Sequence, residues 1–207
     1  MIQRKLDPDL AAALAERIRA VEAASSAELV VEIRAHSGSY SHADARFGAL
    51  VAFVALLIVL FSPWDFKDLW VPPVVLGAYI MGILVARILS LIRRAMTTRR
   101  DRDRRVRVTA AATFVERGVT NTTRETGLLI FLSLLERRME LIADRGVLDA
   151  VPVLEWNQLL EKTRQRDADA NALLDVIREL EPLLTKYVPA RAGDRDELAD
   201  EIRFVNR

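Results

Sequence analysis

Two long apolar stretches near the middle of the chain constrain its fold more than any other feature. Residues 47–62 carry no charged side chain, and residues 69–92 carry only Arg87. A helix of about 20 apolar residues spans the hydrocarbon core of a bilayer, which is roughly 30 Å thick. The connection between the two stretches is so short that they must run antiparallel. We therefore expect residues 47–92 to form a transmembrane helical hairpin within the lipid bilayer.

A buried hairpin inside a soluble protein is the alternative interpretation of these stretches. The chain has 207 residues, and core helices in a domain of this size normally keep one polar face, which neither stretch shows. The mean hydropathy is +0.13 although 29% of the residues are charged, so apolar residues must be segregated along the chain. Membrane insertion explains this segregation better. A cleavable signal peptide is not expected, because 46 residues precede the first stretch.

The residues within and between the stretches suit a hairpin of this kind. Pro63 should end the first helix, because proline cannot continue the helical hydrogen-bond pattern. Trp64 and Trp70 are suited to the headgroup layer of a membrane. Small residues at a spacing of four predict that the helices pack closely on each other or on a second copy. These residues are Gly48, Ala52, Ala78, Gly82 and Ala86.

The charges beside the stretches predict the orientation of the hairpin. Eight arginines and two aspartates lie between Arg93 and Arg107 inclusive, whereas the connection carries one lysine and two aspartates. Because Lys and Arg are enriched in cytoplasmic loops, we place residues 93–107 in the cytoplasm and the tip of the hairpin outside. We therefore expect a multi-pass protein of the inner (plasma) membrane. Because two spans return the chain to its starting side, both termini should lie in the cytoplasm. Arg87 lies close enough to the cytoplasmic surface to reach it.

The arginine run between Arg93 and Arg107 also predicts a partner. Basic side chains next to a span are attracted to anionic lipid headgroups, by about 1 kcal/mol for each residue near the surface. Nucleic acid is a less economical partner, because the run lacks the interleaved aromatic side chains on which bases stack. We therefore expect contact with anionic lipid and no nucleic-acid binding.

The segments that flank the hairpin show the pattern of an interrupted α/β domain. Residues 1–46 contain a predicted helix that starts at Asp7 and Pro8, and a predicted strand over residues 28–35. One helix and one strand cannot bury a core alone, so their partners must lie beyond the hairpin. Residues 93–190 supply these partners, and residues 191–207 form a charged tail with room for a short helix. The expected elements after the hairpin are a helix at 109–117, strands at 127–135 and 139–143, and helices at 152–165 and 168–186.

Apolar periodicity predicts which side chains these elements bury. The first helix should bury one stripe, and the first strand should bury every second residue. Phe114 should anchor the helix that ends before Gly118, and the strand at 127–135 should be covered on both faces. Without the hairpin, the elements make an α/β sandwich with helices on both faces of the sheet. The core positions expected in the first helix, the first strand and the last two helices are Leu10, Leu14, Ile18, Val21, Leu29, Val31, Ile33, Trp156, Leu159, Leu160, Leu173, Val176, Ile177, Leu180 and Leu184.

The strand pair over residues 127–147, GLLIFLSLLERRMELIADRGV, resembles the central hairpin of the TPM domain. SSAELVVEI at residues 25–33 is similar to the opening of that domain. The resemblance implies a compact α/β domain with a small sheet of mixed strand direction, and many bacterial relatives are membrane proteins. Some relatives are described as phosphatases and some as binding divalent ions. The acidic-Asn-Gly sequence of many members is replaced here by Glu125, Thr126 and Gly127, and the membrane hairpin is inserted inside the domain rather than at a terminus.

Three carboxylates are the candidates for hydrolytic or metal chemistry: Asp144 after a strand, Glu125 before the central strand and Glu136 in the turn. A hard cation would need several such oxygens to converge at about 2.0–2.6 Å. Asp144 is the best single candidate, and its simpler interpretation is capping or pairing with an arginine. His36 and His42 are interpreted as solvated linker residues. The sequence has no glycine-rich phosphate loop and no serine hydrolase motif. We assign no catalytic, metal-ligating or cofactor-binding residue and expect no cofactor.

Two functions remain open from the sequence. The first is a non-enzymatic, membrane-anchored α/β domain that acts as an interaction or accessory module for other membrane proteins. The alternative is a divalent-metal-assisted phosphatase in the same location. Asp144 and Glu125 are the residues on which an ion site of that alternative would depend.

Overall fold

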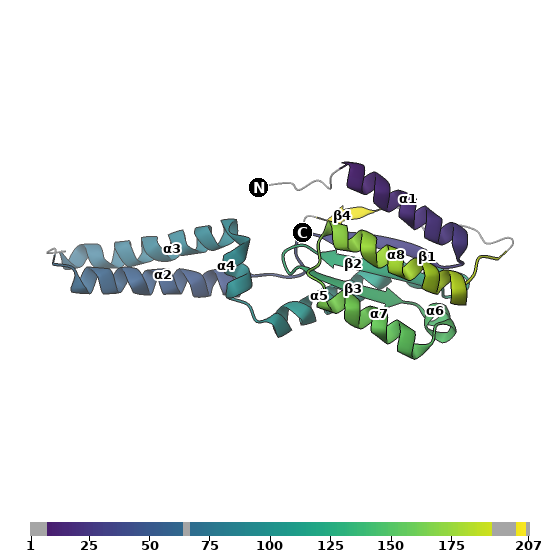
Figure 1. Ribbon diagram of the computed structural model, residues 1–207. Coiled ribbons are helices and arrows are strands. Elements are labelled where there is room, and N and C mark those ends of the chain that lie inside the picture. Colours follow the sequence, from purple (N-terminus) through teal and green to yellow (C-terminus); the bar gives the residue numbers. More distant parts are fainter. Residues whose placement is uncertain (1–7, 64–66, 192–201, 206–207) are drawn as a thin grey trace. The chain divides into compact units, whose positions relative to one another are not determined.

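The computed structural model describes residues 8–63, 67–191 and 202–205 (Figure 1). The predictions for Asp7 and Trp64 lie outside these residues. The chain forms two compact units. The hairpin unit comprises Gly38–Arg102, and the α/β unit combines Met1–Ser37 with Asp103–Arg207.

A small mixed sheet forms the centre of the α/β unit. Its strands β1 (Glu28–Arg34), β2 (Gly127–Ser133), β3 (Arg138–Ala143) and β4 (Arg203–Val205) are ordered β3-β2-β1-β4. β1 pairs in parallel with β2 and with β4, whereas β2 and β3 form the antiparallel hairpin that the sequence predicts. Every residue of β2 is buried, as expected for a central strand covered on both faces. The predicted α/β fold with a small mixed sheet is confirmed.

Three helices pack on one face of this sheet. Figure 1 shows α1 (Pro8–Ala24) and α8 (Ala170–Tyr187) side by side on this face, and α7 (Val153–Gln165) completes the layer. The predicted stripes are confirmed, except that Leu10 and Leu160 are only partly buried. Apolar residues recur every three or four positions in these helices, so they lie on one side of each helix. This side packs against the inward-facing residues of β1, β2 and β3. The result is one continuous core whose strand residues include Leu29, Ile33, Leu128, Ile130 and Leu132.

The opposite face of the sheet is covered by α5 (Arg99–Glu116). Val106, Ala110 and Phe114 of this helix pack on Leu129 and Phe131 of β2. The helix begins ten residues before the expected start at 109. Its first turns are polar and show no apolar stripe, so the sequence pattern does not indicate that they are helical. It ends as expected, since Gly118 adopts a left-handed conformation with φ 64° just beyond it.

Two further elements of the α/β unit differ from expectation. A short helix, α6 (Arg145–Ala150), directly follows β3 where the sequence indicated only the end of a strand. The chain end contains a strand, β4, rather than a short helix. β4 pairs with β1 from Arg203 to Val205, and its Phe204 packs against the main core. Its three residues follow a run of charged residues, so no apolar alternation marks this strand in the sequence.

The hairpin unit contains two long apolar helices. They are α2 (Ser41–Phe61) and α3 (Val71–Ile88), and the 3-10 turn η1 (Asp68–Trp70) precedes the second. Ser41–Phe61 and Asp68–Ile88 are each long and apolar enough to cross a membrane. α2 starts before the expected residue 47 and ends before Pro63 as predicted. The second helix stops at Ile88, where Leu89 is extended, and resumes as α4 (Ser90–Ala95), so the apolar stretch over residues 69–92 does not form one continuous helix.

The small residues of the two helices lie in the contact between α2 and α3. Gly48, Ala52, Gly82 and Ala86 are buried there, and Ala78 is partly buried. A Cβ atom added to Gly82 would lie 2.8 Å from the Cα atom of Gly48, which is closer than packed carbon atoms approach. The backbones therefore meet directly, as the spacing of small residues predicts.

Candidate functional site

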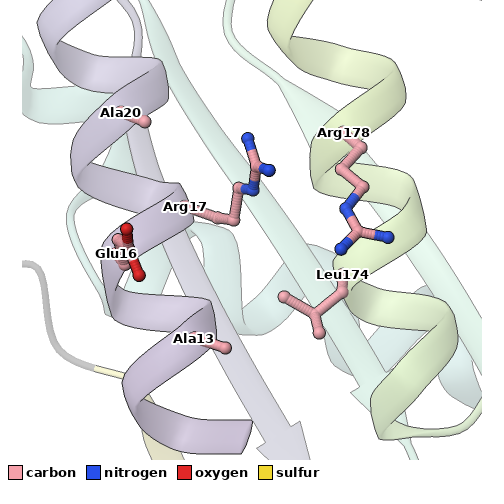
Figure 2. Close-up of a pocket in the computed structure, with 6 residues that line it drawn as sticks. All are labelled: Ala13, Glu16, Arg17, Ala20, Leu174 and Arg178. Atoms are coloured by element: carbon pink, nitrogen blue, oxygen red, sulfur yellow. The ribbon is translucent and has the colours of Figure 1, made fainter.

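A surface groove lies between α1 and α8 in the α/β unit (Figure 2). Its volume is about 300 Å³. Ala13 and Ala20 have short side chains that leave space along α1, and Leu174 of α8 supplies an apolar wall. Figure 2 shows Arg17 from α1 and Arg178 from α8 extending into the space between the helices. Residues far apart in the sequence thus form one concave surface with two guanidinium groups.

The two guanidinium groups are held by weak ion pairs. Arg17 Nη1 lies 3.3 Å from Glu181 Oε2, and Arg178 Nη1 lies 3.4 Å from Asp175 Oδ1. Such exposed pairs contribute about 0–1 kcal/mol, and a guanidinium carries five N–H donors. An incoming carboxylate or phosphate can therefore replace these contacts at little cost. The groove is suited to recognising an anionic group, with Glu16 as an acidic residue in its lining.

A buried polar cluster lies at the carboxyl ends of the parallel strands β1 and β2. Glu136 Oε1 accepts a hydrogen bond of 2.9 Å from the backbone N–H of Ser37, and Glu136 Oε2 accepts one from the Ser133 hydroxyl. The Ser37 hydroxyl donates to Ser133 Oγ at 2.8 Å, and the Thr109 hydroxyl donates to the carbonyl oxygen of Ser37 at 2.8 Å. These bonds hold the last residue before the hairpin unit against α5. The carboxylate of Glu136, a candidate for hydrolysis, is therefore used in these structural hydrogen bonds.

A second buried carboxylate, Glu32 of β1, was missed by the sequence analysis. Its side chain is 1% exposed and lies between two arginines, with Arg34 Nε 2.5 Å from Oε1 and Arg117 Nε 2.7 Å from Oε2. The Arg34 guanidinium also donates to the Thr113 hydroxyl at 2.9 Å and lies 5.7 Å from the ring centre of Phe131. The pattern of β1 predicted a solvent-facing position for Glu32. The only sequence signal was an arginine two residues later on the same face of the strand.

The candidate residues Asp144 and Glu125 lie together at the other end of the β2–β3 hairpin. Asp144 Oδ1 accepts a hydrogen bond of 2.8 Å from the backbone N–H of Arg145 and so caps α6. Glu125 has an exposed side chain and a left-handed backbone with φ 56°, and its carbonyl oxygen accepts from Gly146 N–H at 2.8 Å. Glu136 lies in the turn at the opposite end of the same strands. The three carboxylates therefore do not converge on one point.

The two histidines do not both lie in a linker. His36 follows β1 in a loop and is half-buried, whereas His42 is exposed in the first turn of α2. The interpretation of His42 as a linker residue is wrong because the helix begins earlier than the uncharged stretch. Among the residues that the structure describes, no three His, Asp or Glu side chains are grouped to hold a metal ion.

A buried ion pair joins α2 to α4 within the hairpin unit. Asp44 of α2 has a side chain only 4% exposed, and Arg93 of α4 donates to both of its carboxylate oxygens at 2.8 Å. The hydrogen bonds to Asp44 raise the pKa of the Arg93 guanidinium above its ordinary value. Arg87 Nε lies 3.7 Å from the same carboxylate. Arg93, expected to contact lipid headgroups, is thus held by a partner within the chain.

Comparison with known proteins supports the fold. No family model and no curated protein matches the chain. The chain is similar to the NMR structure of the BA42 protein from the psychrophilic bacterium Bizionia argentinensis, with 17% identity and a TM-score of 0.57. The similarity covers 99% of this chain and 98% of that protein. At this identity it shows a shared fold and carries no statement about activity.

Proposed function

We propose that this chain is a two-span membrane protein whose cytoplasmic α/β unit serves as an interaction or accessory module for other membrane proteins. The observation that carries the proposal is the outward surface of the hairpin unit. Phe53, Ile58, Leu76 and Met81 are each at least 58% exposed on α2 and α3. An apolar surface of this extent would be unfavourable in water, whereas acyl chains would cover it without cost.

The charges next to the hairpin support the orientation with both termini in the cytoplasm. The arginines between Arg94 and Arg107 follow the second helix, whereas the tip carries one lysine and two aspartates. The positive-inside bias then favours a cytoplasmic location for the α/β unit, with its resemblance to the TPM domain. The arginines beyond Arg93 supply the predicted contact with anionic lipid headgroups.

The groove between α1 and α8 supports the role in interaction. Arg17 and Arg178 present hydrogen-bond donors beside apolar residues and Glu16. Arginine is enriched in protein interfaces and pairs strongly with carboxylates, so the groove supports binding of an acidic side chain of a partner protein. The carboxylates considered for a phosphatase have other roles: Asp144 caps a helix and Glu136 binds Ser37 and Ser133. We therefore favour the interaction module over metal-assisted hydrolysis.

Cysteine labelling tests the proposed topology, because the chain has no native cysteine. We expect a membrane-impermeant maleimide to label Asp68→Cys at the hairpin tip in intact spheroplasts. It should label Ala12→Cys and Asp149→Cys, which are exposed in the α/β unit, only after lysis. Labelling of Ala12→Cys or Asp149→Cys in intact spheroplasts would contradict the assigned orientation.

Photo-cross-linking from the groove tests the proposed interaction. A photoreactive amino acid at Ala13, which lines the groove, should give an adduct with a membrane protein, whereas Ala12 on the same helix should not. Because the arginines are proposed to hold the partner, Arg17→Gln with Arg178→Gln should reduce the adduct at least tenfold. Arg19→Gln, on the same helix but outside the groove lining, is the matched control. Equal adducts from Ala12 and Ala13 would rule out the groove as the docking surface.

A further inference from the structure

The outward side of α5 in the α/β unit forms a surface of which the proposed function uses only the arginines. We define the α5 outer face as one exposed side of this helix. Successive residues of the face are either three or one positions apart in the sequence. The same spacing continues to an exposed acidic residue at each end, Asp101 and Glu116, so the face is the stretch between them. Its members are Arg104, Arg107, Val108, Ala111, Ala112 and Val115.

The two valines of this face are unusual for an exposed helix. Val108 is 62% exposed and Val115 is 68% exposed. β-branched residues lower helix propensity, and exposed helix positions normally carry stronger helix formers. Neither valine contributes to the core between α5 and the sheet, which Val106, Ala110 and Phe114 form from the opposite side of the helix. Packing within the α/β unit therefore does not explain these two side chains.

We propose that the α5 outer face lies on the anionic lipid surface of the membrane in which the hairpin is anchored. Arg104 and Arg107 bind lipid phosphates, and Val108 and Val115 enter the boundary between headgroups and acyl chains. Arg107 Nε lies 3.9 Å from Glu140 Oε1, but its side chain is 62% exposed and so weak a pair can be exchanged for a phosphate. This proposal rests on the membrane insertion of the hairpin and adds to it an orientation of the α/β unit. The lipid contact extends beyond the arginine run, because the two valines carry its apolar part.

Charge and chain length favour lipid as the occupant of this face. Arginines beside a membrane span are attracted to anionic lipid headgroups, and the two exposed valines give this face an apolar part. Arg104 is sixteen residues from Ile88, the last residue of α3, so an extended chain could separate them by at most about 56 Å. α4 and the first turn of α5 shorten this tether further, so the face stays close to the membrane.

Docking of the α5 outer face would leave the opposite layer free. α5 covers one face of the sheet, and α1 and α8 cover the other. The groove with Arg17 and Arg178 would then open away from the lipid, where it is accessible to the cytoplasmic part of a partner. Lipid contact and partner contact would use different arginines on different faces.

Quenching by spin-labelled lipids tests this proposal with the full chain. An environment-sensitive fluorophore is attached to Val108→Cys, Val115→Cys, Val153→Cys or Ile58→Cys in separate proteins, which are reconstituted into vesicles. Val153 is a matched valine, 71% exposed on α7, and Ile58 reports on the hairpin. We expect quenching at positions 108 and 115 to exceed that at position 153 at least threefold in equimolar phosphatidylcholine and phosphatidylglycerol. In phosphatidylcholine alone this excess should fall by half or more.

Charge variants separate lipid contact from other occupants of the face. Arg104→Gln with Arg107→Gln should reduce quenching at position 115 to the level of position 153, whereas Arg19→Gln with Arg145→Gln should leave it unchanged. Quenching at position 58 without quenching at 108 and 115 would overturn the inference and retain the anchored hairpin. A fluorophore at 108 or 115 that shifts to the blue without lipid quenching would indicate a protein on this face and also overturn it. Absence of quenching at position 58 would contradict membrane insertion itself.

Discussion

Replacing Glu32 with alanine is expected to lower the free energy of unfolding of the α/β unit by about 3 kcal/mol. Removing one member of a buried ion pair typically costs about 3–5 kcal/mol, because the remaining charge stays desolvated without a partner. Here two guanidinium groups, those of Arg34 and Arg117, lose their shared carboxylate. Their side chains are 19% and 25% exposed, so water partly replaces the lost bonds and the effect falls at the lower end of that range.

Urea denaturation of the full chain in mild detergent measures this effect. Trp156 is buried in the core of the α/β unit, so its fluorescence reports unfolding of that unit once Trp64 and Trp70 are replaced by phenylalanine. Glu116→Ala is the matched control, because Glu116 is 70% exposed and lies 3.9 Å from the same Arg34. We expect the control to change stability by less than about 1 kcal/mol. Similar losses for Glu32→Ala and Glu116→Ala would show that burial does not strengthen the pair.

Replacing Gly82 with leucine is expected to separate α2 from α3 and to destabilise the hairpin unit by about 3 kcal/mol. The added Cβ would lie 2.8 Å from the Cα atom of Gly48 and 3.1 Å from the side chain of Val51. The nearest of these atoms belongs to the backbone, so no rotamer change can relieve the contact. Overpacking a well-filled interface costs about 1–3 kcal/mol, and a backbone clash belongs at the upper end.

Gly77 provides a control within the same helix. A Cβ atom at Gly77 meets no atom within 4 Å, so Gly77→Leu should leave the hairpin intact. The distance between spin labels at Phe53 and Ile80, measured in lipid vesicles, should increase or broaden in Gly82→Leu only. An unchanged distance distribution in Gly82→Leu would mean that the two glycines do not set the approach of the helices.

The elements with strong apolar periodicity were predictable from the sequence. The stripe of α1, the predominantly apolar β2 and the helices α7 and α8 place their side chains as the spacing indicates, because burial of apolar surface dominates their positions. The close contact of α2 and α3 was predictable from Gly48 and Gly82, since only residues without bulky side chains allow such an approach.

The features that depend on distant residues were not predictable in the same way. Glu32 is buried only because Arg34 and Arg117 meet it in the folded unit, and Arg117 is remote from it in sequence. β4 is a strand because β1 offers an unpaired edge, which its own three residues do not reveal. The α1–α8 groove requires two helices from opposite ends of the chain, so neither Arg17 nor Arg178 stands out in the sequence.

The pairing of β1 with β2 governs how this protein can be synthesised. The two strands are hydrogen-bonded neighbours, yet residues 35–126 separate them and include the entire hairpin. During synthesis on the ribosome, β1 cannot pair with β2 until both apolar helices have been translated, because β2 follows them in the sequence. If only one of these helices crossed a bilayer, β1 and β2 would lie on opposite sides of the membrane. In the proposed two-span topology, closure of the sheet therefore requires that both apolar helices insert, because a chain with one inserted helix could not pair β1 with β2.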